Sequence, residues 1–204
     1  MKIYDSIFID LDGPILDGKY RHYNCYRDII KKFGGVPLDI ETYWEMKRER
    51  KDLKVILSYS NINASSENFK ELWIQNIEED SYLKYDKLKP EIINSILRFK
   101  TKADNIYLVT MRSNEKNLFK QLDNLRLSHL FDKIVICNYI KNQSKYSLLK
   151  NEPRTNAIFI GDTEVDLEAA RLLNVKFIGI INGLRNSNFF IGEETCEELY
   201  LINI

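Results

Sequence analysis

Apolar runs alternate with segments of helical periodicity along much of the chain. Short runs rich in β-branched and aromatic residues predict five buried strands, at residues 4–10, 105–110, 133–137, 157–161 and 175–181. Stripes of helical spacing predict helices that open at 89–91, span 113–125, begin near Ser144 and run from Asp162 to Asn174. This alternation predicts an α/β fold with a doubly wound, mostly parallel, Rossmann-like sheet.

Residues 18–87 break this rhythm. Helical stripes cover residues 20–33, 42–52 and 69–77, while 55–59 fits either a helix or a strand. We therefore expect an α/β core domain made of residues 1–17 and 88–204. An inserted α-helical cap domain is expected at residues 18–87.

The charge balance and the cysteine content of the chain argue against several classes of function. Lys plus Arg and Asp plus Glu both number 30 in 204 residues, so the formal net charge is zero. This balance argues against a general nucleic-acid or membrane-surface binder, which usually has a basic excess. No apolar run has the length of a membrane span. Three scattered cysteines and a charged start without a leader favour a cytoplasmic setting.

Two predicted strands end in pairs of carboxylates. Asp10 and Asp12 close the first strand, and Asp162 and Asp166 follow the strand at 157–161. Ligands bind in the crevice outside the carboxyl ends of strands in open α/β sheets, so these four side chains should converge there. Carboxylates that converge repel one another unless a cation lies between them. A hard divalent cation such as Mg²⁺ is the natural candidate.

These motifs resemble the haloacid dehalogenase-like (HAD) superfamily of phosphohydrolases. The resemblance spans nearly the whole chain and rests on Asp10-Leu11-Asp12-Gly13, on Thr110 at a strand end, on a lysine near a helix start and on Gly161-Asp162 with Asp166. The lysine best matches Lys145, with Lys141 as a nearby rival. The insertion at 18–87 is similar to the family's C1-type helical cap. Pro14 departs from the threonine that many members carry after the first motif.

The resemblance implies a role for each motif residue. Asp10 would be the nucleophile, Asp12 the general acid and base, and Thr110 and Lys145 would bind the phosphoryl group. Asp10, Asp162 and the backbone carbonyl of Asp12 would hold Mg²⁺. Asp166 would bind the metal directly or through water, or would orient Lys145.

The expected activity is Mg²⁺-dependent hydrolysis of a small phosphorylated metabolite through an aspartyl phosphate. A sugar phosphomutase and a catalytically impaired binding protein remain alternatives, and nothing in the sequence indicates the oligomeric state. Candidate substrate-binding residues are Arg112, two residues past Thr110, Tyr20 in the cap, and Lys47 and Arg48 in its densest basic cluster. On one long helix, Lys47 would share a face with Arg50, Lys51 and Lys54. Arg185, just past the strand at 175–181, is a further candidate near the site.

Overall fold

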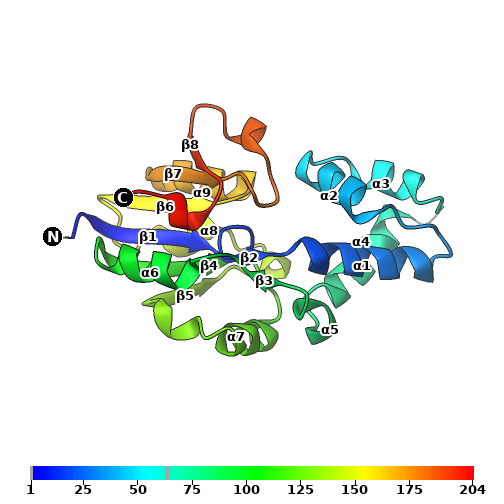
Figure 1. The fold of residues 1–204 in the computed structure, drawn as a ribbon, viewed down its shortest axis with the longest axis horizontal. Helices are drawn as coiled ribbons and strands as arrows, with labels where there is room; N and C mark the ends of the chain where they lie inside the picture. Colours follow the sequence, from blue (N-terminus) through cyan, green and yellow to red (C-terminus); the bar gives the residue numbers. More distant parts are fainter. Residues whose placement is uncertain (1, 63–64) are drawn as a thin grey trace. The chain divides into compact units, whose positions relative to one another are not determined.

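The computed structural model describes residues 2–62 and 65–204. The chain divides into two compact units, drawn in Figure 1. We call Met1–Asp17 together with Leu88–Ile204 the α/β unit, and Gly18–Lys87 the helical unit. Among the described residues, no helix has the length and apolar character needed to cross a membrane.

The α/β unit is built on one sheet of six parallel strands. Their spatial order is β5 (Lys133–Ile136), β4 (Ala103–Thr110), β1 (Tyr4–Asp10), β6 (Ala157–Gly161), β7 (Lys176–Ile180) and β8 (Glu194–Cys196). The five predicted strands are present. The pattern missed β8, because this edge strand has three residues, two of them exposed, and no apolar run marks it.

Side chains of β1 point alternately to the two faces of the sheet, because successive residues of a strand face opposite ways. Ile7 and Ile9 belong to a core cluster with α6 (Ile92–Lys100) and α7 (Glu115–Asn124). Phe8 belongs to a second cluster with α8 (Lys145–Leu149) and α9 (Glu164–Leu173). Helices therefore cover both faces, as the doubly wound prediction requires.

The ends of these helices follow the capping preferences of their residues. Ser144 caps α8 by accepting a hydrogen bond from the Ser147 N–H, and Asn174 ends α9 with a left-handed φ of 56°. The prediction for α6 was less accurate. Pro90 lies before the helix rather than in its first turn, because Glu91 adopts a left-handed conformation and α6 begins at Ile92. The unit also contains the short 3-10 helices η1 (Ser128–Leu130), η2 (Tyr139–Lys141), η3 (Ser187–Phe190) and η4 (Leu199–Leu201).

The helical unit consists of α1 (Lys19–Lys32), α2 (Ile40–Arg48), α3 (Leu53–Tyr59), α4 (Ser66–Asn76) and α5 (Asp80–Leu83). Its centre holds a stacked pair of tyrosines, Tyr26 and Tyr43, with ring centroids 4.1 Å apart. The ambiguous segment at 55–59 is helical, as part of α3. The short strands β2 (Leu16–Asp17) and β3 (Lys87–Leu88) pair where the chain passes between the units.

The long helix expected at 42–52 is divided. α2 ends at Arg48, Arg50 takes a left-handed φ of 57°, and the Asp52 carboxylate accepts from the Lys54 N–H to cap α3. Lys47 therefore lies at the end of one helix and Lys54 at the start of the next. The continuous basic face predicted for this segment is wrong, because periodicity was extended across a break that no glycine or proline marks.

The strand order places a switch point beside β1. From β1 the chain moves outward through β4 and β5, then returns to β6 on the other side of β1 and continues through β7 to β8. A crevice forms at the carboxyl ends of the strands where the order reverses in this way. The two predicted aspartate motifs stand on β1 and just past β6, the strands that flank this switch point.

Candidate active site

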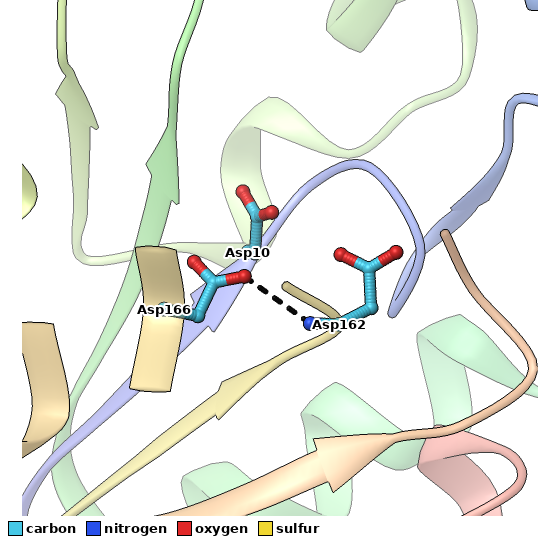
Figure 2. A group of neighbouring side chains, drawn as sticks. All are labelled: Asp10, Asp162 and Asp166. Carbon is cyan, nitrogen blue, oxygen red and sulfur yellow. Dashed lines mark hydrogen bonds between the residues drawn. The ribbon is translucent and has the colours of Figure 1, made fainter. Parts of the chain in front are cut away.

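Three carboxylates meet at the switch point, as Figure 2 shows. Asp10 is the last residue of β1, Asp162 follows β6 directly, and Asp166 lies in the first turn of α9. Each side chain is buried, with at most 7% of the residue exposed. Each offers one oxygen such that all three lie within 4.8 Å of one another. The ends of two strands and the start of a helix thus bring Asp10 to two carboxylates from a distant part of the sequence.

Asp166 holds the turn after β6 and a buried lysine at the same time. Its Oδ2 accepts hydrogen bonds from the Asp162 N–H (3.2 Å), the Thr163 N–H (3.0 Å) and the Thr163 hydroxyl (2.7 Å). Its Oδ1 accepts from Lys145 Nζ at 2.5 Å, and the same ammonium lies 2.9 Å from Asp10 Oδ1. Lys145 is 3% exposed, whereas Lys141 is exposed at the end of η2. The structure therefore brings Lys145, and not its rival, to the carboxylates.

Two glycines leave the space in which the Asp162 carboxylate lies. A Cβ added at Gly13 would stand 2.0 Å from Asp162 Cγ, and one added at Gly183 would stand 2.3 Å from Asp162 Oδ2. Gly13 also has a φ of +93°, which side-chain-bearing residues rarely adopt. The Leu184 N–H donates to Asp162 Oδ2 at 2.5 Å. The loops after β1 and β7 thus enclose this carboxylate, and the second loop also donates a hydrogen bond to it.

Burial makes the negative charges of the site unfavourable. Burial raises the pKa of Asp10 to about 7, the carboxylate of Asp166 acts in the same direction, and the Lys145 ammonium opposes both. The pKa of Asp162 is raised well above its ordinary value, first by burial and then by the Asp10 carboxylate. Burial alone would lower the pKa of Lys145, but the two carboxylates beside it raise it. The Lys145 ammonium thus contacts two of the three clustered carboxylates, and carboxylate oxygens are the ligands that a hard divalent cation prefers.

Thr110 closes β4, the neighbour of β1, and is fully buried. Within the described part of the chain, its hydroxyl Oγ1 has no hydrogen-bond partner. Buried hydroxyls nearly always have one, so this group calls for an explanation. A phosphoryl oxygen bound at the site would supply the missing acceptor.

Asp12 and Arg112 form an ion pair at the same edge of the sheet. Arg112 Nη2 donates to Asp12 Oδ1 at 2.8 Å. The arginine side chain is 4% exposed and the aspartate side chain is 33% exposed. The sequence predicted Arg112 as a substrate ligand and did not foresee this pairing.

The remaining predicted residues lie in the helical unit. Lys47 and Arg48 end α2 and are half-buried, and Lys47 Nζ lies 5.4 Å from the centre of the Trp73 ring. Tyr20 stands in the first turn of α1, 43% exposed, with Lys87 Nζ 4.8 Å from its ring centre. These side chains present positive charge beside aromatic faces.

Sequence reasoning missed how the loop after β7 supports the site. Besides the Leu184 N–H on Asp162, Arg185 pairs with Glu164, two residues past Asp162, with Nε 2.8 Å from Oε2. A glycine in the loop that follows β7 was the available signal for Gly183. Nothing in the sequence singled out Glu164.

Similarity to known proteins identifies the family and the fold of the chain. A family model described as haloacid dehalogenase-like hydrolase matches residues 7–180. A haloacid dehalogenase-like family hydrolase from Streptococcus pneumoniae is 20% identical with a TM-score of 0.70, and the match covers 96% of this chain and 95% of that one. A predicted phosphatase from Clostridium acetobutylicum is 19% identical with a TM-score of 0.70, covering 95% and 94%.

A third solved structure is named as bound to magnesium. This HAD-hydrolase from Bacillus subtilis is 16% identical with a TM-score of 0.59, and the match covers 88% of this chain and 89% of that one. No curated protein sequence gives a significant match. At such sequence identities the solved structures show only a shared fold. The assignment to a family rests on the family model that matches residues 7–180.

Proposed function

The chain belongs to the haloacid dehalogenase-like hydrolases, and from this membership we propose that it is a Mg²⁺-dependent phosphatase of a small organic phosphomonoester. The observation that carries the proposal is the buried Asp10 carboxylate held 2.9 Å from Lys145 Nζ, beside Asp162 at the switch point. A buried nucleophile with a neighbouring cation and a second carboxylate suits attack on a phosphate anion. The substrate is a small phosphorylated metabolite, and the balanced charge of the chain gives no support for nucleic acid.

Asp10 is the proposed nucleophile. Its carboxylate forms a bond to phosphorus while the bond to the leaving oxygen breaks, which gives an aspartyl phosphate. Asp12 gives its proton to the leaving oxygen in this step. The resulting carboxylate then takes a proton from the water that hydrolyses the aspartyl phosphate.

Asp10, Asp162 and the backbone carbonyl of Asp12 would hold Mg²⁺. The fit is supported by the oxygen donor set, by the excess of buried carboxylates over ammonium and by the two glycines around Asp162. When bound, the ion supplies positive charge that reduces the repulsion between the carboxylates and the phosphate. Asp166 has both oxygens engaged by Lys145 and by the turn after β6, which favours its orienting role among the alternatives.

Lys145 and Thr110 bind the phosphoryl group in this proposal. The Lys145 ammonium neutralises charge on the phosphoryl oxygens, and Asp166 fixes its position. The Thr110 hydroxyl donates to one of those oxygens, which would end its lack of a partner. Both groups are fixed before substrate arrives, so little reorganisation is needed during the transfer.

The helical unit, residues 18–87, is proposed as the cap that selects the leaving group. Lys47, Arg48 and Tyr20 are its candidate contacts. Their positive and aromatic side chains suit a leaving group that carries an anionic or apolar part. Selectivity would then be separate from the chemistry of the α/β unit.

Release of phosphate from p-nitrophenyl phosphate, with and without Mg²⁺, tests the proposal. Turnover should require Mg²⁺ and fall by at least about 10³-fold in Asp10→Asn, because that variant lacks the nucleophile. Lys145→Met should lose about 10²-fold or more. Lys141→Met, the matched exposed lysine, should keep wild-type turnover. Unchanged turnover in Asp10→Asn would refute the mechanism, and binding of Mg²⁺ without phosphate release would favour a mutase.

A further inference from the structure

Arg112 stands where the register of the sheet brings it to Asp12. β1 and β4 are parallel neighbours in which Asp10 lies opposite Val109. Asp12 is two residues past Asp10, and Arg112 is three residues past Val109, so both leave the sheet at the same edge. The 2.8 Å contact between Arg112 Nη2 and Asp12 Oδ1 joins the loops that follow these two strands.

The pair is asymmetric in burial. The Asp12 side chain is 33% exposed, so solvent and substrate can reach it, whereas the Arg112 side chain is 4% exposed and is held by its surroundings. Guanidinium is planar and stays charged, which gives its contacts a fixed direction. The contact therefore ties one oxygen of the accessible Asp12 carboxyl to a buried partner with directional donors.

We propose that Arg112 is a positioning residue that holds the Asp12 carboxyl for proton transfer to the leaving oxygen. This inference rests on the proposed phosphatase function and replaces the prediction that Arg112 is a substrate ligand. A general acid must lie within hydrogen-bond reach of the atom it protonates, and small displacements of such a group lower the rate steeply. Arg112 acts through Asp12 and makes no contact with the reacting atoms.

This role can be tested by comparing substrates whose leaving groups differ in basicity. 2,4-Dinitrophenolate leaves without a proton, whereas an alkoxide such as that of propyl phosphate requires one. The value of kcat/KM covers the steps up to the first irreversible bond cleavage, so hydrolysis of the aspartyl phosphate does not enter it. General acid catalysis contributes about 10²–10⁴-fold, and a misplaced acid loses part of this. Arg112→Met should lower kcat/KM for propyl phosphate by about 30–100-fold and for 2,4-dinitrophenyl phosphate by less than about 3-fold.

A double-mutant cycle separates action through Asp12 from direct action on the substrate. In an Asp12→Asn background, Arg112→Met should change kcat/KM for propyl phosphate by less than about 3-fold, because the group that it positions is gone. If the two effects multiply, or if Arg112→Met slows both substrates equally, Arg112 binds the phosphate and the inference is overturned.

Two further measurements test whether Arg112→Met lowers activity only by disturbing the structure of the site. Calorimetric titration of Arg112→Met with Mg²⁺ should give a Kd within about 2-fold of wild type, since Arg112 is not a proposed ligand of the ion. Arg112→Lys keeps the charge without the planar guanidinium, and it should show the same selective loss with a smaller amplitude. A Kd for Mg²⁺ weakened together with both substrates would show that the variant disturbs the whole site, and would count against positioning.

The failure of this inference is distinct from failure of the proposed function. If wild type turns over neither substrate with Mg²⁺, or if Asp10→Asn keeps its turnover, the phosphatase proposal itself is wrong. If Asp10→Asn is inactive and the Arg112→Met effect is the same for both leaving groups, only the role of Arg112 is wrong.

Discussion

The two units bury charge in different ways. In the helical unit, the buried side chains of Arg21 and Asp86 form an ion pair, with Nε 3.0 Å from Oδ1. At the switch point of the α/β unit, the Lys145 ammonium contacts the carboxylates of Asp10 and Asp166, and Asp162 adds a third buried carboxylate to the cluster. Removing one partner of a buried ion pair destabilises a fold, whereas buried carboxylates in excess of the cations beside them raise its free energy until a ligand compensates their charge. The comparison thus separates a structural use of charge from a functional one.

Two left-handed glycines give the largest expected contrast. Gly13 has a φ of +93° and no room for a Cβ beside Asp162. Gly34 in the helical unit has a φ of +75°, and apart from its chain neighbours no atom of the described residues lies within 4 Å of its Cβ position. Gly13→Ala should displace Asp162 and lower phosphate release by about 10²-fold or more, as loss of fixed catalytic groups does. Gly34→Ala should lower stability by about 1–2 kcal/mol through backbone strain alone.

Thermal unfolding and p-nitrophenyl phosphate turnover of both variants check this contrast. Gly34→Ala should keep the Mg²⁺ dependence and the turnover of wild type. Wild-type turnover in Gly13→Ala would show that the Asp162 carboxylate tolerates displacement, and that the site is less tightly built than its contacts indicate.

Neutralising one acid in each unit should change stability in opposite directions. Without Mg²⁺ at pH 8, Asp86→Asn should lower the free energy of unfolding by about 3 kcal/mol, because a buried pair loses one charge. Asp10→Asn should raise it by about 1–3 kcal/mol, because the site loses one of its unbalanced carboxylates. Urea denaturation in EDTA measures both. If Asp10→Asn instead lowered the free energy of unfolding, the attraction between Asp10 and Lys145 would outweigh the repulsion between Asp10 and the neighbouring acids.

The pH dependence of the metal-free protein follows from the same charge. The pKa of Asp10 is raised from 3.8 to about 7 in the folded protein. The folded protein therefore keeps a proton that the unfolded chain releases, so the stability from Asp10 is present below about pH 4 and is lost as pH rises to about 7. Asp10→Asn should flatten this decline, and Mg²⁺ should reverse it in wild type only. Urea titrations at pH 5 and pH 8 provide the check.

The placement of the aspartates and of Thr110 in the α/β unit could be predicted from sequence because it depends on local features. Asp10, Thr110 and Asp162 each close or follow an apolar run, and a run marks the end of its strand without knowledge of the rest of the fold. Parallel strands then bring their carboxyl ends to one edge. The choice of Lys145 needed the family resemblance, which calls for a lysine near a helix start, and Ser144 marked that start.

Contacts between distant segments could not be predicted in this way. The pairing of Asp12 with Arg112 depends on β1 and β4 being neighbours in a particular register, which no local pattern encodes. The space around Asp162 depends on glycines 170 residues apart (183 minus 13). In the helical unit even a local feature failed, because the left-handed Arg50 divides a helix without a glycine or proline to announce it.

Lys47 in the helical unit gives the smallest expected effect and the most direct test of a separate selectivity function. Lys47→Ala should lower stability by no more than about 1 kcal/mol, the usual size of an accessible cation–π contact such as that with Trp73. Turnover of p-nitrophenyl phosphate should stay within about 2-fold of wild type, because the reacting groups are untouched. Across a panel of phosphorylated sugars and acids, KM should rise by about 5–10-fold for substrates with a second anionic group, through loss of one charged contact. Lys70→Ala, an exposed lysine on α4, is the matched control and should leave the ranking unchanged. If Lys47→Ala lowers kcat equally for every substrate, this part of the helical unit contributes to the chemistry, and the division between the two units is wrong.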